Sequence, residues 1–530
     1  MKVVFRSLIL CGLFSAVLPA GCKRAEPPLK KESPNLPRLR ELDFAPFAKA
    51  LTSVGKRRLV AVDRHVRGGD IDSVGAAMAE GKVNSEELTL YFLDRIRRND
   101  ETLRSYLELN PAALEEARAA DRERTAGKVR GKLHGIPVNL KDNIATVAPL
   151  HTTAGAEILL DHSPAADAAV VKKLRDAGAV ILGKASLSEL AGTLTTEPPG
   201  YNAISGMGVN PYRADLPVSG SSSGSAISTS AFLTMASVGT ETSGSLIAPG
   251  ASNGVVAMMP GPGVVSGEGI VPLIRFQDSA GPIARSVRDA ALLLAVMDEA
   301  ETDYVAALDR AALKGVAAGV LRKGILANKG EDGTHFWLVR IGDGLKKAGA
   351  SPRDLDETFA DKPSLLPVIF LGLSIDTVGY LTAAGAPVKS LADLHRYHLA
   401  DPARRIPQGQ NMVDFALRVL PELVNEGGPA ATTLYEEAAR FTRTGAADRL
   451  AATFAAGEVE LLVSLANTHS DVYATAGYPA ITVPLGLDGA GAPNGVTFIG
   501  KPGEETRLLS FAYAFEQATG YRRAPSDRAE

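Results

Sequence analysis

The sequence predicts an α/β protein in which helices cover both faces of a central sheet. The chain has 530 residues, 45% of them hydrophobic and 22% charged, which is typical of globular proteins with a large buried core. The clearest local pattern is a helical segment at 167–177 that ends at Gly178 and is followed by an entirely apolar run at 179–182. A helix followed by a short apolar strand is typical of sheets buried on both faces. A long Ala-, Leu-, Glu- and Arg-rich region at 300–460 predicts an inserted helical layer.

Helix signals precede this pattern, and we expect ordered structure to begin near Ile71. Asn84 and Glu87 form a predicted capping box, and apolar residues follow them at helical spacing. Asn110 precedes a proline and begins a second predicted helix that extends to about residue 126. Toward the C-terminus, two further apolar runs are expected to be strands of the same sheet, at 461–463 and 480–483.

The N-terminus has the layout of a secretory signal. Two basic residues precede a mostly apolar run at 8–18, and the small residues Ala20 and Gly21 follow it. The run is too short to span a bilayer comfortably. We therefore expect residues 1–21 to be a signal peptide and the protein to be exported to the cell envelope.

Cys22 ends a Leu-Pro-Ala-Gly-Cys sequence that resembles a bacterial lipobox, in which the cysteine is lipidated and anchors the protein to a membrane. Cleavage by an ordinary signal peptidase is the alternative, because Pro19 is unusual at its position. Residues 22–70 are expected to form a Pro- and charge-rich tether and leader, and 71–530 the globular domain. Cys11 and Cys22 are the only cysteines, so we expect that domain to have no disulfide and no thiol nucleophile.

Composition argues against some classes of function. The chain carries 57 basic and 60 acidic residues, a net charge of −3, so no basic field favours nucleic acid. His395 and His398 lie three positions apart, but other metal-ligand types do not gather beside them in the sequence. We interpret the pair as one face of a helix, and we expect neither a metal nor a cofactor.

Two Gly/Ser turns carry the first chemical signal. Residues 217–226 hold five serines and two glycines, and 239–245 form a second turn of the same kind. A flexible linker is the alternative for any Gly/Ser run. The first run is short, however, and leads into the mostly apolar segment 231–238. Two such turns, rich in hydroxyl and backbone N–H groups, can converge to hold an oxyanion.

A lone lysine, Lys141, follows a mostly apolar, strand-like run at 135–140. Most lysines are solvated surface residues, and that is the alternative for this one. A lysine buried at the end of a strand has a lowered pKa, because burial disfavours the ammonium form. Its neutral amine is then a base.

Together these segments resemble the amidase signature family, and in motif they are most similar to its bacterial peptide amidases. The resemblance extends from about residue 71 to residue 525. It rests on the order and spacing of the segments rather than on any one of them. The matching segments are 135–144, 152–155, 182–189, 217–226, 239–245, 269–272, 277–287, 476–484, 495–500 and 508–518.

The resemblance implies a large mixed sheet covered by helices, and it makes residues 71–530 an amidase catalytic domain. It implies a Ser-Ser-Lys triad in which neutral Lys141 takes a proton through Ser221, held by a cis peptide, and so activates Ser245. Ser245 would then attack a carboxylic amide and form an acyl-enzyme, with no cofactor. The substrate would be a small-molecule or peptide amide, including C-terminal peptide amides.

The resemblance also implies an oxyanion hole lined by the N–H groups of Thr242, Ser243, Gly244 and Ser245, with Ser222 in a supporting place. Some positions depart from the family pattern, and they bear on substrate fit and rate rather than on reaction type. They are Ser223, Ser243, Ile247 and Gly267.

Two other functions fit parts of the sequence. Gly220-Ser-Ser-Ser-Gly224 matches the nucleophile elbow of α/β-hydrolase esterases, with Ser222 as nucleophile. That elbow must follow a buried strand, whereas a proline-containing segment at 214–218 precedes it. The other alternative is a catalytically weak or inactive binding protein on an amidase scaffold, because a fold alone does not determine function.

Overall fold

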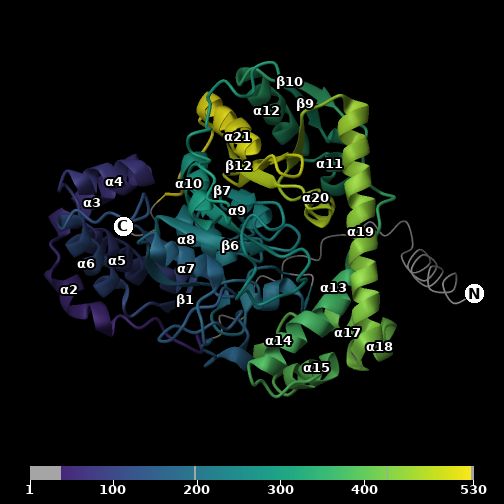
Figure 1. Ribbon diagram of the computed structural model, residues 1–530, viewed down its shortest axis with the longest axis horizontal. Helices are drawn as coiled ribbons and strands as arrows, with labels where there is room; N and C mark the ends of the chain where they lie inside the picture. The colour runs from purple at the N-terminus through teal and green to yellow at the C-terminus, as the bar shows by residue number, and fades with distance from the viewer. Residues whose placement is uncertain (1–36, 196–197, 427, 527–530) are drawn as a thin grey trace, which may run out of the picture. The chain divides into compact units, whose positions relative to one another are not determined.

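The computed structural model describes residues 37–195, 198–426 and 428–526 (Figure 1). The expected signal peptide, Cys22 and the first part of the tether lie outside the described residues.

An 11-stranded mixed sheet runs through the described part of the chain. In the order in which they lie side by side, the strands are β1 (Tyr106–Leu109), β3 (Val180–Ala185), β2 (Pro137–Lys141), β6 (Ala236–Glu241), β8 (Ser279–Ala284), β7 (Val256–Met259), β12 (Ala480–Leu487), β13 (Pro493–Ile499), β11 (Leu461–Leu465), β9 (Ala317–Val320) and β10 (Ser351–Asp354). Strands β3, β2 and β6 are parallel, as are β11, β9 and β10, and the other neighbours pair antiparallel. The predicted α/β fold with a large mixed sheet is confirmed.

Helices flank this sheet. In chain order, the helices and short helical turns are η1 (Ala45–Phe47), α2 (Ala48–Ser53), α3 (Lys56–Gly68), α4 (Ile71–Ala79), α5 (Ser85–Leu103), α6 (Ala113–Thr125), η2 (Glu157–Leu159), α7 (Ala169–Asp176), η3 (Glu189–Gly192), α8 (Ser223–Ser230), α9 (Ile247–Ser252), α10 (Val287–Met297), α11 (Arg322–Lys329), α12 (Thr334–Lys347), α13 (Leu366–Gly372), η4 (Leu373–Thr377), α14 (Val378–Ala383), α15 (Leu391–Leu399), α16 (Pro402–Arg405), α17 (Asn411–Val419), α18 (Pro421–Glu426), α19 (Gly428–Gly457), α20 (Ser470–Ala476) and α21 (Glu505–Thr519). A separate two-stranded ribbon pairs β4 (Tyr201–Asn202) with β5 (Gly206–Met207).

Both faces of the sheet are buried. On β11, Leu461 and Val463 pack in the largest hydrophobic cluster, whereas Leu462 between them packs in a second cluster. The largest cluster includes α10 and α21, and the second includes residues of α8 and α9. Because successive side chains point to opposite faces of a strand, the two clusters cover opposite faces of the sheet. The all-apolar strands of the sequence are explained by this double burial.

Ordered structure begins before Ile71, so the predicted leader was wrong for its second half. Helices η1, α2 and α3 precede that residue, and Phe47, Val62 and Val66 are buried in the largest cluster. Val62 and Val66 stand four positions apart and form a narrow apolar stripe on α3. Many residues around this stripe are Lys or Arg, so the composition of the segment resembles that of an exposed leader and does not reveal the helix. The capping box of α5, by contrast, is confirmed, since Asn84 and Glu87 each accept the other's backbone N–H.

The region 300–460 is mostly helical, but it also supplies two strands that the sequence analysis missed. Strands β9 and β10 extend the sheet beyond β11 by parallel pairing. Each has only four residues, and β10 is the polar sequence Ser-Pro-Arg-Asp. Such short segments carry no apolar alternation that would predict a strand.

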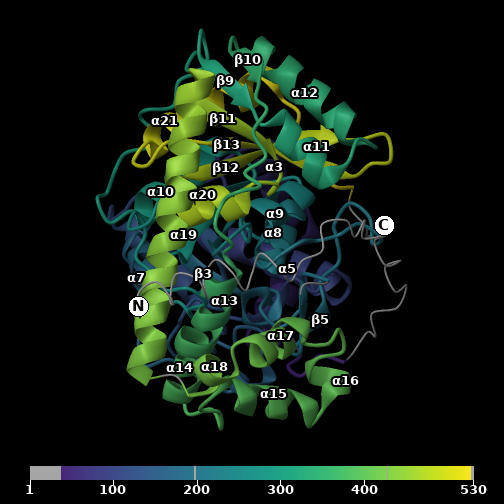
Figure 2. The ribbon, with the colours of Figure 1, turned by 90° about the vertical axis from the view of Figure 1, so that its right-hand side faces the viewer.

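Helices α13–α18 of the inserted region lie together, apart from α11 and α12, and α19 leads from them back to strand β11 of the sheet (Figures 1 and 2). Figure 2 shows α19 extending from the group α13–α18 past α20. Among the described residues, one helical stretch is long and apolar enough to cross a membrane by length and composition alone, Leu366–Ala383 in α13, η4 and α14. It packs against α19 in the fold, and 44% of it is buried.

Candidate active site

Lys141 is the last residue of β2, and its side chain is completely buried. Its Nζ donates to Ser221 Oγ at 2.7 Å, to Thr240 Oγ1 at 2.8 Å and to Thr240 O at 3.2 Å. Burial lowers the pKa of Lys141 from 10.5 to about 7, against an opposing effect of the carboxyl groups of Asp278 and Glu241. The surface alternative for this lysine is therefore excluded. Neutral amine and ammonium are both populated near neutral pH.

The first Gly/Ser turn is packed tightly against the segment that follows β3. The Gly220–Ser221 peptide is cis, and the Ser188 N–H donates to Ser221 O at 3.0 Å. A Cβ atom on Gly220 would lie 2.3 Å from Ser188 Oγ, and one on Gly224 would lie 2.4 Å from Ser105 O. Both glycines are thus required by close approach of the chain. The turn is part of the packed fold, not a linker.

The second turn brings Ser245 to the same place. The Ser222 N–H donates to Ser245 O at 3.1 Å, which ties the two turns together. Ser221, Ser243 and Ser245 line one cavity of about 270 Å³. The structure therefore gathers the three predicted triad residues, with Lys141 behind Ser221.

Ser222 lies beneath this cavity rather than in its wall. Its hydroxyl donates to Thr240 O at 3.0 Å and accepts the Thr240 N–H at 3.2 Å. These bonds hold the end of β6 against the first turn. No histidine of the described residues is hydrogen-bonded to Ser222, and an esterase elbow needs such a partner. His398 binds Gln410 instead, and His469 binds Ser464.

Glu241 shapes the turn that was predicted to hold the oxyanion. Its carboxylate accepts the N–H groups of Gly244 at 2.7 Å, Leu246 at 2.7 Å and Ile247 at 3.0 Å. The Gly244 N–H, which was predicted to line the oxyanion hole, is thus bound to Glu241 in this structure. The N–H groups of Thr242, Ser243 and Ser245, by contrast, have no acceptor in the part of the chain that the structure describes. They are available to an oxyanion.

Gln277 and Asp278, which directly precede β8, bind the same turn through Thr242. Thr242 Oγ1 donates to Asp278 at 2.5 Å, and Gln277 Nε2 donates to Thr242 O at 2.6 Å. Burial raises the pKa of Asp278 to about 6, while its hydrogen bonds lower it. Sequence reasoning assigned no role to these residues or to Glu241. Their only signal was their presence in the matching segments 239–245 and 277–287.

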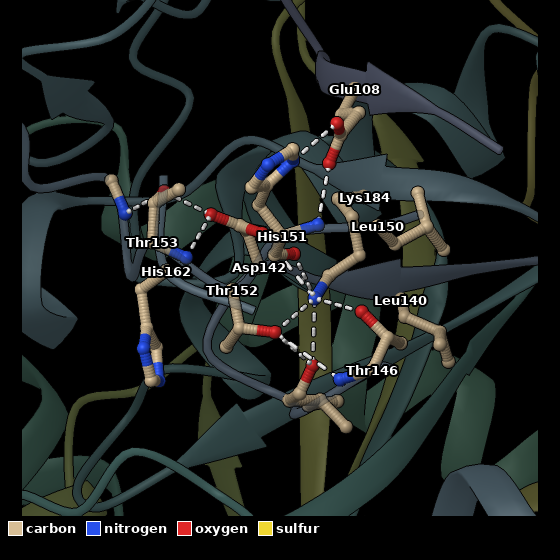
Figure 3. Close-up of polar contacts among 12 residues, drawn as sticks. Glu108, Leu140, Asp142, Thr146, Leu150, His151, Thr152, Thr153, His162 and Lys184 are labelled. Atoms are coloured by element: carbon tan, nitrogen blue, oxygen red, sulfur yellow. Dashed lines mark hydrogen bonds and ion pairs between the residues drawn. The ribbon is translucent and has the colours of Figure 1, made fainter. Parts of the chain in front are cut away.

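A second buried lysine, Lys184 on β3, has a different environment (Figure 3). Four oxygens lie 2.8–3.0 Å from its Nζ and can accept its three N–H groups, and Asp142 Oδ1 lies 3.4 Å away. The four acceptors are Ile144 O, Thr146 Oγ1, His151 O and Thr152 Oγ1. Burial lowers the pKa of Lys184, but the charge of Asp142 opposes this effect, and so many acceptors favour the ammonium form, which has three N–H donors and no lone pair. Lys184 therefore holds the segment after β2 in place and is not a second base.

No group of three or more His, Cys, Asp or Glu side chains among the described residues could hold a metal ion. His395 and His398 lie on α15, where His395 contacts Asp414.

Known proteins resemble this chain over most of its length. A model of the Amidase family matches residues 87–337. A probable amidase of Arabidopsis thaliana is 35% identical over 479 residues, which are 86% of this chain and 91% of that protein. The structure of an amidase family protein of Bacillus anthracis aligns with a TM-score of 0.83 and 32% identity over 91% of this chain and 97% of its own. The peptide amidase of Stenotrophomonas maltophilia aligns with a TM-score of 0.77 and 36% identity over 86% and 98%.

These relatives and this fold define an enzyme that hydrolyses amides. The chain belongs to the amidase family, as the sequence resemblance implied. Its similarity to the peptide amidases is likewise confirmed.

Proposed function

We propose that this amidase uses Lys141, Ser221 and Ser245 as its catalytic triad. The observation that carries the proposal is the 2.7 Å contact between Lys141 Nζ and Ser221 Oγ, behind a cavity that Ser221 and Ser245 line. A serine hydroxyl is a poor nucleophile without a base beside it. A fully buried lysine with a pKa of about 7 supplies that base at neutral pH.

In the proposed reaction, neutral Lys141 takes the proton of Ser221 as Ser221 takes that of Ser245. The Ser245 oxygen forms a bond to the amide carbon, and the N–H groups of Thr242, Ser243 and Ser245 stabilise the oxyanion. Each such donor contributes about 3–4 kcal/mol to the barrier reduction. The C–N bond then breaks as the relayed proton passes to the leaving nitrogen. Water hydrolyses the acyl-enzyme by the same relay.

The substrate class that we propose is small-molecule amides and C-terminal peptide amides. Two observations support it, the likeness to peptide amidases and a cavity of about 270 Å³ that admits a small side chain next to the serines. Ammonia release from peptide, aryl and fatty amides tests the class. Labelling by a fluorophosphonate tests activity of the serine itself, and an unlabelled, folded protein would favour the inactive binding protein.

We also propose that the protein is exported and anchored through Cys22. The lipobox-like sequence at 18–22 supports this. Expression in a bacterial host with radioactive palmitate should label the wild type and not Cys22→Ala. A soluble, unlabelled wild-type protein in the periplasm would favour ordinary signal cleavage.

A further inference from the structure

Glu189 lies in the wall of the active-site cavity but has no part in the proposed triad. It begins η3, it lines the cavity together with Ser221 and Ser245, and its side chain is largely buried. The preceding residue, Ser188, donates its N–H to Ser221 O and accepts the Gly200 N–H at 2.7 Å. Glu189 is therefore held in a defined place beside the bridging serine.

One oxygen of the Glu189 carboxyl group is bound and the other is not. Oε2 accepts the Ala203 N–H at 3.0 Å. Oε1 has no hydrogen-bond partner among the residues that the structure describes. Arg405 lines the same cavity, but its guanidinium binds Glu157, with the shortest contact at 3.1 Å, and forms no ion pair with Glu189. Oε1 is thus left for a molecule in the cavity.

The surroundings of Glu189 favour its neutral form. Burial, together with the negative charge of Glu157, raises the pKa of Glu189 to about 8, against the opposing effects of the Ala203 N–H and Arg405. The described ionisable groups that face it are Glu157 on η2, Arg405 on α16, Tyr201 on β4 and Tyr397 on α15. Because Oε2 accepts an N–H, the proton of the neutral acid belongs on Oε1. At neutral pH, Oε1 is a hydrogen-bond donor.

The backbone around Glu189 is strained in a way that helps to fix it. The next two residues, Leu190 and Ala191, have φ values of 45° and 61°, although neither is glycine. Left-handed conformations of non-glycine residues persist only where their surroundings hold them, and they gather at functional sites. Leu190 is held by its N–H bond to Ala154 O at 2.9 Å. The chain conformation directly after Glu189 is thus held in place by this contact.

We infer that Glu189 is a specificity-determining residue, whose Oε1–H donates a hydrogen bond to a second carbonyl oxygen of the substrate, beyond the scissile amide. This inference rests on the proposed function, since the scissile carbonyl is taken to lie at the N–H groups of Thr242, Ser243 and Ser245. Glu189 stands in the segment that follows β3, beside Ser188, and so meets a different part of the substrate. The class that fits is an acylated amino-acid amide or peptide amide, which has a second carbonyl on the N-terminal side of the residue whose amide is hydrolysed.

A matched pair of substrates tests this inference. N-acetyl-leucinamide has the second carbonyl, and 4-methylpentanamide is the same amide without the acetamido group. With N-acetyl-leucinamide at pH 7, Glu189→Ala should raise KM about tenfold, because the loss of one hydrogen bond weakens binding by about that factor. The value of kcat should stay nearly unchanged. With 4-methylpentanamide the same variant should behave as the wild type. Glu189→Gln should stay close to the wild type with both, because its NH₂ group replaces the Oε1–H donor.

The pH dependence separates this role from a structural one. The donor form of Glu189 is present below its pKa and is lost as pH rises through about 8, so the wild-type KM for N-acetyl-leucinamide should rise there. Glu189→Gln should lack this rise. Glu157→Gln is the matched control, because it removes a carboxylate beside Arg405 that does not line the cavity. It should keep the rise but move it to lower pH, because the charge of Glu157 raises the pKa of Glu189.

Three results would overturn the inference. Equal effects of Glu189→Ala on both substrates would indicate a structural residue, and a KM that falls at high pH would indicate an acceptor. The third concerns affinity measured by calorimetry. If the Ser245→Ala protein and the double variant Ser245→Ala/Glu189→Ala bind N-acetyl-leucinamide equally tightly, Glu189 makes no contact with the substrate. That measurement needs no turnover. If the wild type binds both amides but hydrolyses neither, the proposed function is contradicted. The role of Glu189 is then decided by the calorimetric binding of N-acetyl-leucinamide alone.

Discussion

Replacing Lys141 by arginine should remove the base of the reaction while keeping a positive charge. A pKa of about 7 makes about half of the lysine neutral at pH 7, whereas the ordinary value of 10.5 would leave about one molecule in 3,000 neutral. Burial thus raises the concentration of the working form by about a thousandfold. A guanidinium stays protonated in proteins and supplies none of it. We expect the rate of acylation to fall by about 10³-fold, within the usual range for general bases.

The assay is a pH–rate profile of kcat/KM with 4-methylpentanamide. This substrate lacks the second carbonyl, so titration of Glu189 does not enter the profile. The wild-type rate should rise with pH through about 7 and then level off, because neutral lysine accumulates above its pKa. Lys141→Arg should be slow and flat. Since arginine is larger than the fully buried lysine, Lys141→Met is the second variant, of similar length and without a base.

Circular dichroism and thermal unfolding give the control for both variants. A folded Lys141→Met or Lys141→Arg protein with a rate near that of the wild type would refute the reasoning. So would a wild-type profile that is flat between pH 5 and 9, since no group of the lysine's pKa would then control the rate.

The remaining predictions concern the nucleophile, metals and the oxyanion turn. Ser245→Ala should abolish turnover, and the trapped acyl group should be found on Ser245 by mass spectrometry; an adduct on Ser222 would support the esterase elbow. Chelators and thiol reagents should leave the activity of the mature enzyme intact, and a loss that zinc restores would contradict the metal-free mechanism. Glu241→Gln should lower kcat about 10- to 100-fold with little change in KM, because a neutral amide holds the three N–H groups of the turn less well; unchanged kcat would show that the turn is held by other contacts.

Much of the fold was predictable because a strand that is buried on both faces appears in the sequence as a continuous run of apolar residues. The strands at 461–465 and 480–487 are apolar in nearly every position, and the sequence analysis recognised both. The capping box at Asn84 and Glu87 was equally readable, since its two members lie three residues apart. Strand β10 was not, because it is held by pairing with β9 and carries no pattern of its own. Local patterns reveal elements that are stabilised locally or buried on a regular face.

The same distinction holds for the site. Lys141, Ser221 and Ser245 stood in recognisable segments, but the groups that tune them are distant in the chain. Thr242 and Asp278 are 36 positions apart, and only the fold brings them together. The Gly244 N–H was assigned to the oxyanion because the sequence does not show which way Glu241 turns. Glu189 was part of a matching segment, yet its place in the cavity wall depends on two left-handed residues that no sequence pattern predicts.

The two buried lysines show why burial alone does not identify a base. Lys184 is surrounded by four oxygens and a carboxylate, including two backbone carbonyls that can only accept. Losing its proton would leave buried acceptors unpaired, at a cost of about 1–3 kcal/mol for each. Lys141 meets two hydroxyl groups and one carbonyl, and no carboxylate within hydrogen-bonding distance. A hydroxyl can donate as well as accept, so the Ser221 hydroxyl can reverse its bond when Lys141 is neutral. The environment of Lys141 therefore accommodates both of its protonation states, which is what a base that must gain and release a proton in each cycle requires.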